Sequence, residues 1–169
     1  MSLIIFLIYL ENYTEFAKTY NISYNITNIW KRGDVWNMKN NYFYAMLSRM
    51  KYINRWGLMR NTRNENLSEH SLEVAFIAHA LGVINNEVFG GDINAERLAV
   101  LGMYHDVTEI ITGDMPTPVK YYSPYIRNAY KEVEQVANEQ MLSGLPEVLR
   151  ARYAGLLLEA ENEVGLWEY

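Results

Sequence analysis

Hydrophobic side chains recur three and four residues apart along most of the chain after Met38. In the stretch NNYFYAMLSRMKYI, for example, Phe43, Met46, Leu47 and Met50 share one face of a helix. No segment longer than a few residues alternates between apolar and polar positions, and neither an internal repeat nor a low-complexity tract is present. The pattern predicts an all-α fold of about five or six helices.

A second helix is expected to begin at Ser68, a good N-cap residue, and to end in NNEVFGGD. His70 falls in the first turn of this helix. Its apolar face is predicted from helical spacing at Leu72, Ala75, Phe76, His79 and Val83. We interpret His79, on that face, as a core histidine or as one that supports a ligand.

Three more helices follow. Asn94 is expected to cap a helix that carries His105 and continues to Gly113, before the prolines of DMPTP. Ser123 opens the next, with Pro124 at its first position, and the last begins at Pro146. The predicted buried positions are Ile126, Tyr130, Val133, Ala137 and Met141 in the fourth helix, and Leu149, Tyr153 and Leu157 in the fifth.

Residues 1–37 lack this periodicity and are expected to form an N-terminal extension without an assigned structure, ahead of one domain at 38–169. The opening run MSLIIFLIYLENY has no preceding positive charge and no cleavage pattern. It is also shorter than the roughly 20 residues that span a bilayer. We therefore expect a cytoplasmic protein without a membrane partner.

The charge and the cysteine count narrow the chemistry. A net charge of −5 argues against a nucleic-acid polymer or an anionic membrane as the main partner. The chain has no cysteine, so a metal site would use carboxylates with at least one of the three histidines, His70, His79 and His105, or oxygen ligands alone.

The segment LGMYHDVTEIITGDMP gathers His105, Asp106, Glu109 and Asp114 within ten residues. On a helix His105 and Glu109 share a face, whereas Asp106 points about 100° away from His105. His105 and Asp106 can therefore reach one ion only at the end or edge of a helix, and His70 is the natural third ligand. Each residue also has an ordinary explanation, as a surface pair, a solvated helix residue or a turn cap. Together they indicate a site.

Two histidines and an aspartate suit Zn, Co, Mn or Fe, which activate water and offset phosphoryl charge. Arg55, Arg60 and Arg63 crowd ahead of His70 in an otherwise acidic chain, and Arg grips phosphate bidentately. Alternatively, these arginines pair with Glu65 and Glu69 in a solvated connector. The first interpretation predicts hydrolysis of a phosphate ester.

Three blocks resemble the HD-domain 5′-deoxynucleotidases of bacteria: LSRMKYINRWGLMRNTRNENLSEHSLEVA, FGGDINAERLAVLGMYHDVTEIITGDMPTPVKYY and LPEVLR. The resemblance implies an HD-domain helical bundle that removes phosphate from deoxyribonucleoside 5′-monophosphates. It implies His70, His105 and Asp106 as metal ligands, and Arg55 and Glu109 as catalytic residues. The residues that it implies for substrate binding are Arg55, Trp56, Asp106, Asp114, Met115, Pro116 and Thr117, with Asp114 near the sugar.

The chain departs from this family in two places. The family pattern begins near Met38, so that residues 1–37 are an upstream extension or a misassigned start. The family takes a fourth metal ligand from an aspartate in an AD-x-L context, whereas this chain ends in LLLEAENEVGLWEY. The acids there, Glu159, Glu161, Glu163 and Glu168, do not match the pattern, and the bundle is expected to be incomplete at its C-terminus.

Two functions are therefore predicted. The first is a cytoplasmic 5′-deoxynucleotidase that uses a divalent ion such as cobalt, manganese or zinc, in a family that tends toward dimers. The alternative is a catalytically impaired remnant that acts as a nucleotide-binding or interaction domain.

Overall fold

The computed structural model describes residues 42–57, 60 and 62–158. This part of the chain is helical and contains no β-strand, which confirms the predicted all-α class. Its elements are α3 (Phe43–Leu47), the 3₁₀ turn η1 (Met50–Tyr52), α4 (Leu67–Phe89), α5 (Ala95–Tyr104), α6 (Glu109–Thr112), α7 (Thr117–Lys120), α8 (Pro124–Ser143) and α9 (Glu147–Leu157). The predicted boundary at residue 38 and the four C-terminal acids lie outside the described residues and stay predictions.

The core lies where α3, α8 and α9 meet the segment that links α5 to α6. Phe43, Leu67 and Met141 are fully enclosed there. The remaining buried members of this cluster are Met50, Val107, Ile110, Leu145 and Leu157. The first predicted helix is shorter than expected, because α3 ends at Leu47 and Met50 reaches the core from the 3₁₀ turn.

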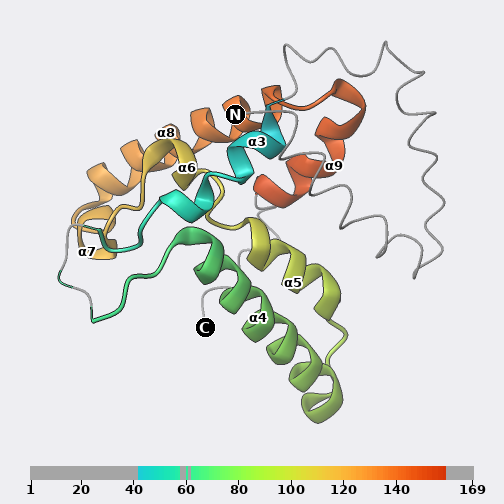
Figure 1. Cartoon of the computed structure of the whole chain (residues 1–169). Helices are drawn as coiled ribbons and strands as arrows, with labels where there is room; N and C mark the ends of the chain where they lie inside the picture. The colour runs from blue at the N-terminus through green and yellow to red at the C-terminus, as the bar shows by residue number, and fades with distance from the viewer. Residues whose placement is uncertain (1–41, 58–59, 61, 159–169) are drawn as a thin grey trace. The chain divides into compact units, whose positions relative to one another are not determined.

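Helices α4 and α5 lie side by side and run in opposite directions (Figure 1). α4 begins two residues earlier than predicted, because Asn66 rather than Ser68 is the N-cap. The Asn66 side chain accepts from the backbone N–H groups of Ser68 and Glu69, and Glu69 completes a capping box. The predicted caps Asn94 and Ser123 are confirmed.

The buried face of α4 is made of small residues, so the predicted apolar face was wrong. Apart from Leu67 at its start, the buried positions are Ser71, Ala75, Ala78 and Gly82. Of the predicted set only Ala75 is buried, whereas Leu72, Phe76, His79 and Val83 are exposed. Small residues occupy this face because they let the backbones of α4 and α5 approach closely. A Cβ on Gly102 of α5 would lie 2.9 Å from the Ala75 Cα, and one on Gly82 would lie 2.9 Å from the Ala95 Cβ.

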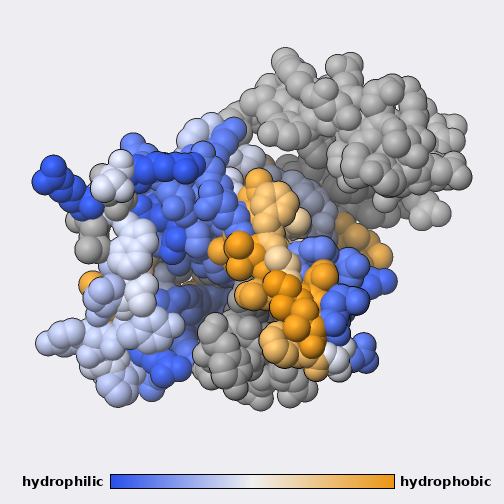
Figure 2. Space-filling view, turned by 90° about the horizontal axis from the view of Figure 1, so that it is seen from below, coloured by the Kyte–Doolittle hydropathy of each residue, from blue (hydrophilic) through white to orange (hydrophobic). Residues whose placement is uncertain are grey.

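The opposite side of α4 leaves large apolar side chains exposed. Phe76, Ile77, Leu81, Val88 and Phe89 all have more than half of their surface accessible. Figure 2 shows apolar side chains gathered on the face seen from below. By length and composition alone α4 could cross a membrane. A single helix of this kind is weak evidence for a membrane-spanning segment, because the core helix of a soluble protein passes the same test. Its first turns carry the polar residues described below.

In α8 and α9 the predicted burial is confirmed at four of the eight positions, and Ile126, Leu149 and Tyr153 are partly buried. Tyr130, Ala137 and Met141 are buried, as is Leu157 at the end of α9. Val133 was wrongly predicted to be buried, since it is 51% exposed. The short helix α7, which begins after Pro116 and includes Pro118, was not predicted.

We predict that Gly102→Ala destabilises the chain, because the new Cβ would meet the backbone of α4 rather than a movable side-chain tip. Overpacking of this kind costs about 1–3 kcal/mol, partly offset by the roughly 1 kcal/mol by which Ala favours a helix over Gly. The free energy of unfolding in urea measures the effect.

Gly155→Ala in α9 is the matched control. Its Cβ would meet only the tip of Arg97 at 3.9 Å, so that substitution is expected to be neutral or stabilising. Equal free energies of unfolding for the two variants would contradict the close packing of α4 against α5.

Candidate metal centre

The chain leaves the α-helix at His105, where one continuous helix to Gly113 had been predicted. α5 ends at Tyr104 and α6 begins at Glu109. In between, Val107 N–H donates to Tyr104 O at 3.2 Å and Glu109 N–H donates to Asp106 O at 3.0 Å. These three-residue spacings tighten the turn and place Val107 and Ile110, three apart, together in the core.

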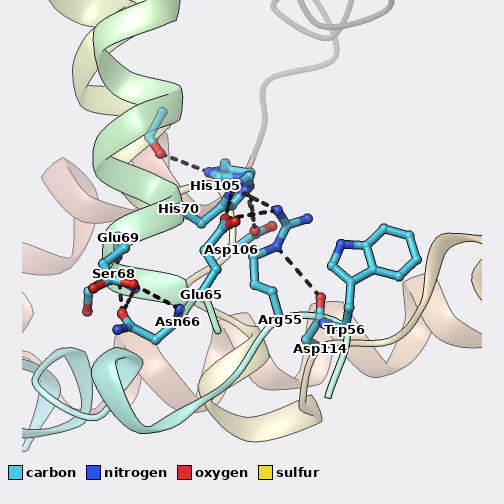
Figure 3. Close-up of polar contacts among 11 residues, drawn as sticks. Arg55, Trp56, Glu65, Asn66, Ser68, Glu69, His70, His105, Asp106 and Asp114 are labelled. Atoms are coloured by element: carbon cyan, nitrogen blue, oxygen red, sulfur yellow. Dashed lines mark hydrogen bonds and ion pairs between the residues drawn. The ribbon is translucent and has the colours of Figure 1, made fainter. Parts of the chain in front are cut away.

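The tight turn brings His105 and Asp106 to the same side, beside the first turns of α4. His105 Nε2 lies 3.0 Å from Asp106 Oδ2, and His70 Nε2 lies 3.6 Å from the same oxygen (Figure 3). One ligand atom from each of the three residues lies within 4.8 Å of the others. The expectation that this pair acts at a helix end, with His70 as the third member, agrees with the geometry.

These separations fit a shared divalent cation. Zinc sites have metal–nitrogen and metal–oxygen distances of about 2.0–2.2 Å, so neighbouring ligand atoms lie roughly 3.0–3.5 Å apart in tetrahedral or octahedral geometry. Both measured contacts to the Asp106 oxygen fall near that range. Two imidazole nitrogens and a carboxylate are also the donor types that borderline metals prefer.

Hydrogen bonding and charge orient His105 and Asp106 in the metal-free chain. His105 Nδ1 lies 2.8 Å from Gly102 O, which can only accept, so the ring donates there and presents Nε2 toward Asp106. Burial acts to lower the pKa of His105, but its hydrogen bond with Asp106 and the charge of that carboxylate outweigh burial and raise the pKa above its usual value. Burial acts to raise the pKa of Asp106, yet His105 holds it below the usual range.

His70 differs from His105 in its electrostatic surroundings. Burial, followed by the positive charge of Arg55, lowers the pKa of His70, so that its neutral ring is favoured. Arg55 NH1 lies 2.7 Å from His70 Nδ1, and Glu65 Oε1 lies 3.0 Å from the same nitrogen. A neutral imidazole is the form that can coordinate a metal.

Arg55 and Trp56 are held beside the histidines by Asp114. The Asp114 carboxylate accepts from the Trp56 backbone N–H and lies 4.0 Å from Arg55 Nε (Figure 3). Trp56 has a positive φ of 54°, an uncommon conformation for a bulky residue. Asp114 itself follows Gly113, whose φ of 75° and ψ of 157° suit glycine alone. The loop from α6 thereby fixes the Arg55–Trp56 turn against the site.

Glu109 is a buried carboxyl at the start of α6, with 7% of its surface exposed. Its Oε2 is buried and has no hydrogen-bond partner among the described residues. Burial raises the pKa of Glu109 to about 8, and the charges of Asp106 and Asp114 add to the rise. The side chain is therefore largely protonated at neutral pH and can give up a proton.

The other predicted site residues lie farther along the loop or outside the cluster. Met115 and Pro116 lead from Asp114 into α7, which begins at Thr117. Arg60 and Arg63 are exposed, and of the three arginines Arg55 is the one in the cluster. His79, exposed on α4, is neither a core nor a supporting histidine there, so that interpretation was wrong.

The sequence indicated Glu65 only as an ion-pair partner of an arginine. The structure confirms that pairing, with Glu65 Oε1 3.4 Å from Arg55 NH1, and adds a contact with His70. Glu69, the other suggested partner, caps α4 instead. The sequence signal for the contact between Glu65 and His70 was the position of Glu65 just ahead of the α4 cap, because that end of the helix carries His70.

Comparison with known proteins agrees with this geometry. Residues 42–168 match the family model described as 5′-deoxynucleotidase YfbR-like. The chain is 55% identical over 122 residues to the 5′-deoxynucleotidase YfbR of Escherichia coli, and 54% identical over 121 residues to a 5′-deoxynucleotidase of Photorhabdus laumondii. Each match covers 72% of this chain and 61% of the relative, so the chain spans about three fifths of the length of these curated relatives.

A solved structure shows the same fold. The crystal structure of an HD-domain phosphohydrolase from Listeria innocua superposes with a TM-score of 0.61 at 28% sequence identity. The match covers 68% of this chain and 54% of the solved chain. The predicted HD-domain architecture is thus confirmed.

The burial of the Glu109 carboxyl predicts how the stability of the chain depends on pH. A carboxyl whose pKa is raised from 4.5 to about 8 on folding stabilises the native state most below its unfolded pKa. That contribution is lost as the pH rises toward 8. Glu109→Gln should therefore stabilise the chain by up to a few kcal/mol at pH 8.5 and have little effect at pH 4.5.

Urea unfolding of the metal-free chain across this pH range measures the difference. Glu139→Gln, which replaces an exposed acid on α8, is the control and should shift stability equally at both pH values. A pH-independent difference between wild type and Glu109→Gln would show that folding does not raise the pKa of Glu109.

Proposed function

We propose that this chain, which belongs to the YfbR-like 5′-deoxynucleotidase family, hydrolyses deoxyribonucleoside 5′-monophosphates to deoxynucleoside and phosphate. The observation that carries the proposal is the convergence of His70, His105 and Asp106 beside Arg55 and Glu109. Families of this kind imply a divalent metal, and these three residues are the proposed ligands. A bound ion of cobalt, manganese or zinc would activate water and offset phosphoryl charge.

Arg55 is proposed to bind the phosphoryl group. Its side chain is 21% exposed, and its guanidinium has the fork geometry that matches phosphate oxygens. Trp56, next in the chain, is proposed to contact the nucleoside, and Met115, Pro116 and Thr117 to complete the binding loop. Asp114, close to both Arg55 and Trp56, is proposed to lie near the sugar and to disfavour ribose.

Glu109 is proposed as the residue that moves the proton. Cleavage breaks the bond between phosphorus and the 5′-oxygen, and the departing oxygen needs a proton. Water supplies the oxygen of the new bond to phosphorus. In the metal-free chain Glu109 is largely protonated near neutral pH, and in that form it can donate to the 5′-oxygen and then recover a proton from the water. Atoms and charge balance over the cycle.

The identity of the metal, a cytoplasmic location and a homodimer stay predictions. The alternative function, a remnant that only binds nucleotides or partners, is not favoured by the family match.

Phosphate release from deoxyadenosine monophosphate and adenosine monophosphate, with cobalt, manganese or no added metal, tests the proposal. We expect metal-dependent release that prefers the deoxy substrate and is lost in His105→Ala. No release from the folded wild-type chain would favour the binding-domain alternative, and activity in His105→Ala would contradict the proposed site.

Arg55 should contribute chiefly to transition-state stabilisation. Arg55→Met is expected to lower kcat/KM by about 100-fold or more, as the loss of a charge-stabilising group does in other enzymes. Arg63→Met, at an exposed arginine of the same connector, is the matched control and should leave kcat/KM near the wild-type value. Steady-state kinetics on the deoxy substrate separates the two, and equal losses would contradict the role of Arg55.

A further inference from the structure

Glu65 is fixed opposite Arg55 by backbone pairing. Arg55 N–H donates to Glu65 O at 2.9 Å, and Leu67 N–H donates to Ile53 O at 3.0 Å. Between these contacts, Asn54 and Asn66 form an isolated antiparallel bridge. The Glu65 side chain therefore projects from a braced segment immediately before the α4 cap.

The Glu65 carboxylate contacts both a proposed metal ligand and the proposed phosphate-binding residue. Its Oε1 lies 3.0 Å from His70 Nδ1 and 3.4 Å from Arg55 NH1 (Figure 3). Arg55 NH1 also lies 2.7 Å from His70 Nδ1. One ring nitrogen thus faces a group that can only accept and another that can only donate.

These two neighbours select opposite tautomers of His70. Donation from Arg55 to Nδ1 requires a lone pair there, which puts the proton of a neutral ring on Nε2. Donation from Nδ1–H to Glu65 leaves the lone pair on Nε2, the nitrogen that lies 3.6 Å from Asp106 Oδ2. Only the second tautomer can coordinate a metal beside Asp106.

We propose that Glu65 is a positioning residue that accepts the His70 Nδ1 proton and so turns the Nε2 lone pair toward the metal. The same carboxylate lies 3.4 Å from the Arg55 guanidinium, so Glu65 contacts the proposed phosphate-binding residue as well. This inference rests on the proposed metal site at His70, His105 and Asp106.

Cobalt titration of the substrate-free chain by calorimetry tests the inference without measuring catalysis. Glu65→Ala should weaken cobalt binding by about 10- to 100-fold, the usual cost of losing a carboxylate that orients a ligating histidine. Glu65→Gln should lose less, because its amide oxygen still accepts a hydrogen bond. Glu69→Gln is the matched control, since Glu69 serves the α4 cap, and should keep wild-type affinity.

The ring-nitrogen signals of His70 supply a second readout that a general loss of stability would not move. Two-bond proton–nitrogen NMR on the metal-free chain should place the neutral-ring proton on Nδ1 in wild type and Glu69→Gln. In Glu65→Ala it should move to Nε2, because Arg55 then becomes the main partner of Nδ1.

The outcomes separate this inference from the proposed function. Wild-type cobalt affinity together with an unchanged tautomer in folded Glu65→Ala overturns the role of Glu65. If Glu65→Ala does not fold, Glu65→Met decides, because it keeps the bulk of the side chain without an acceptor, and wild-type affinity in that variant overturns the role. A wild-type chain that binds no cobalt overturns the metal site and this inference with it.

Discussion

The close, antiparallel contact between α4 and α5 is the constraint on which the site depends. Ala75 and Gly82 on one helix meet Gly102 and Ala95 on the other with no room for larger side chains. Because the helices run in opposite directions, the beginning of α4 and the end of α5 lie at the same end of the pair (Figure 1). Gly102 serves twice, since its carbonyl also orients His105.

Concentrated negative charge sets the chemistry of this end of the helix pair. The negative charge of Asp106 is offset by the two histidines and Arg55. Glu109 is buried nearby with less positive charge around it, and its pKa is raised to about 8. A divalent cation between the histidines and Asp106 would offset the charge that raises the Glu109 pKa. The acids of this site therefore respond to one another, and the arginine and histidines form part of the same electrostatic network.

Sequence patterns predicted the helical class, the caps at Asn94 and Ser123, and the residues that gather at the site. They predicted the buried face of α4 wrongly, because hydrophobicity favoured Phe76 whereas close helix packing required Ala and Gly. The break at His105 was also missed, because Val107 and Ile110 keep a helix-like spacing of three residues beyond it. The contact of Glu65 with His70 depends on a tertiary backbone pairing that periodicity cannot reveal.

Anomalous X-ray diffraction at the cobalt absorption edge, from crystals of the full chain grown with cobalt, tests the central claim most directly. The account predicts one strong anomalous peak bounded by His70 Nε2, His105 Nε2 and the Asp106 carboxylate. Crystals that show the three side chains ordered but without a peak among them, or with the metal bound elsewhere, would contradict it.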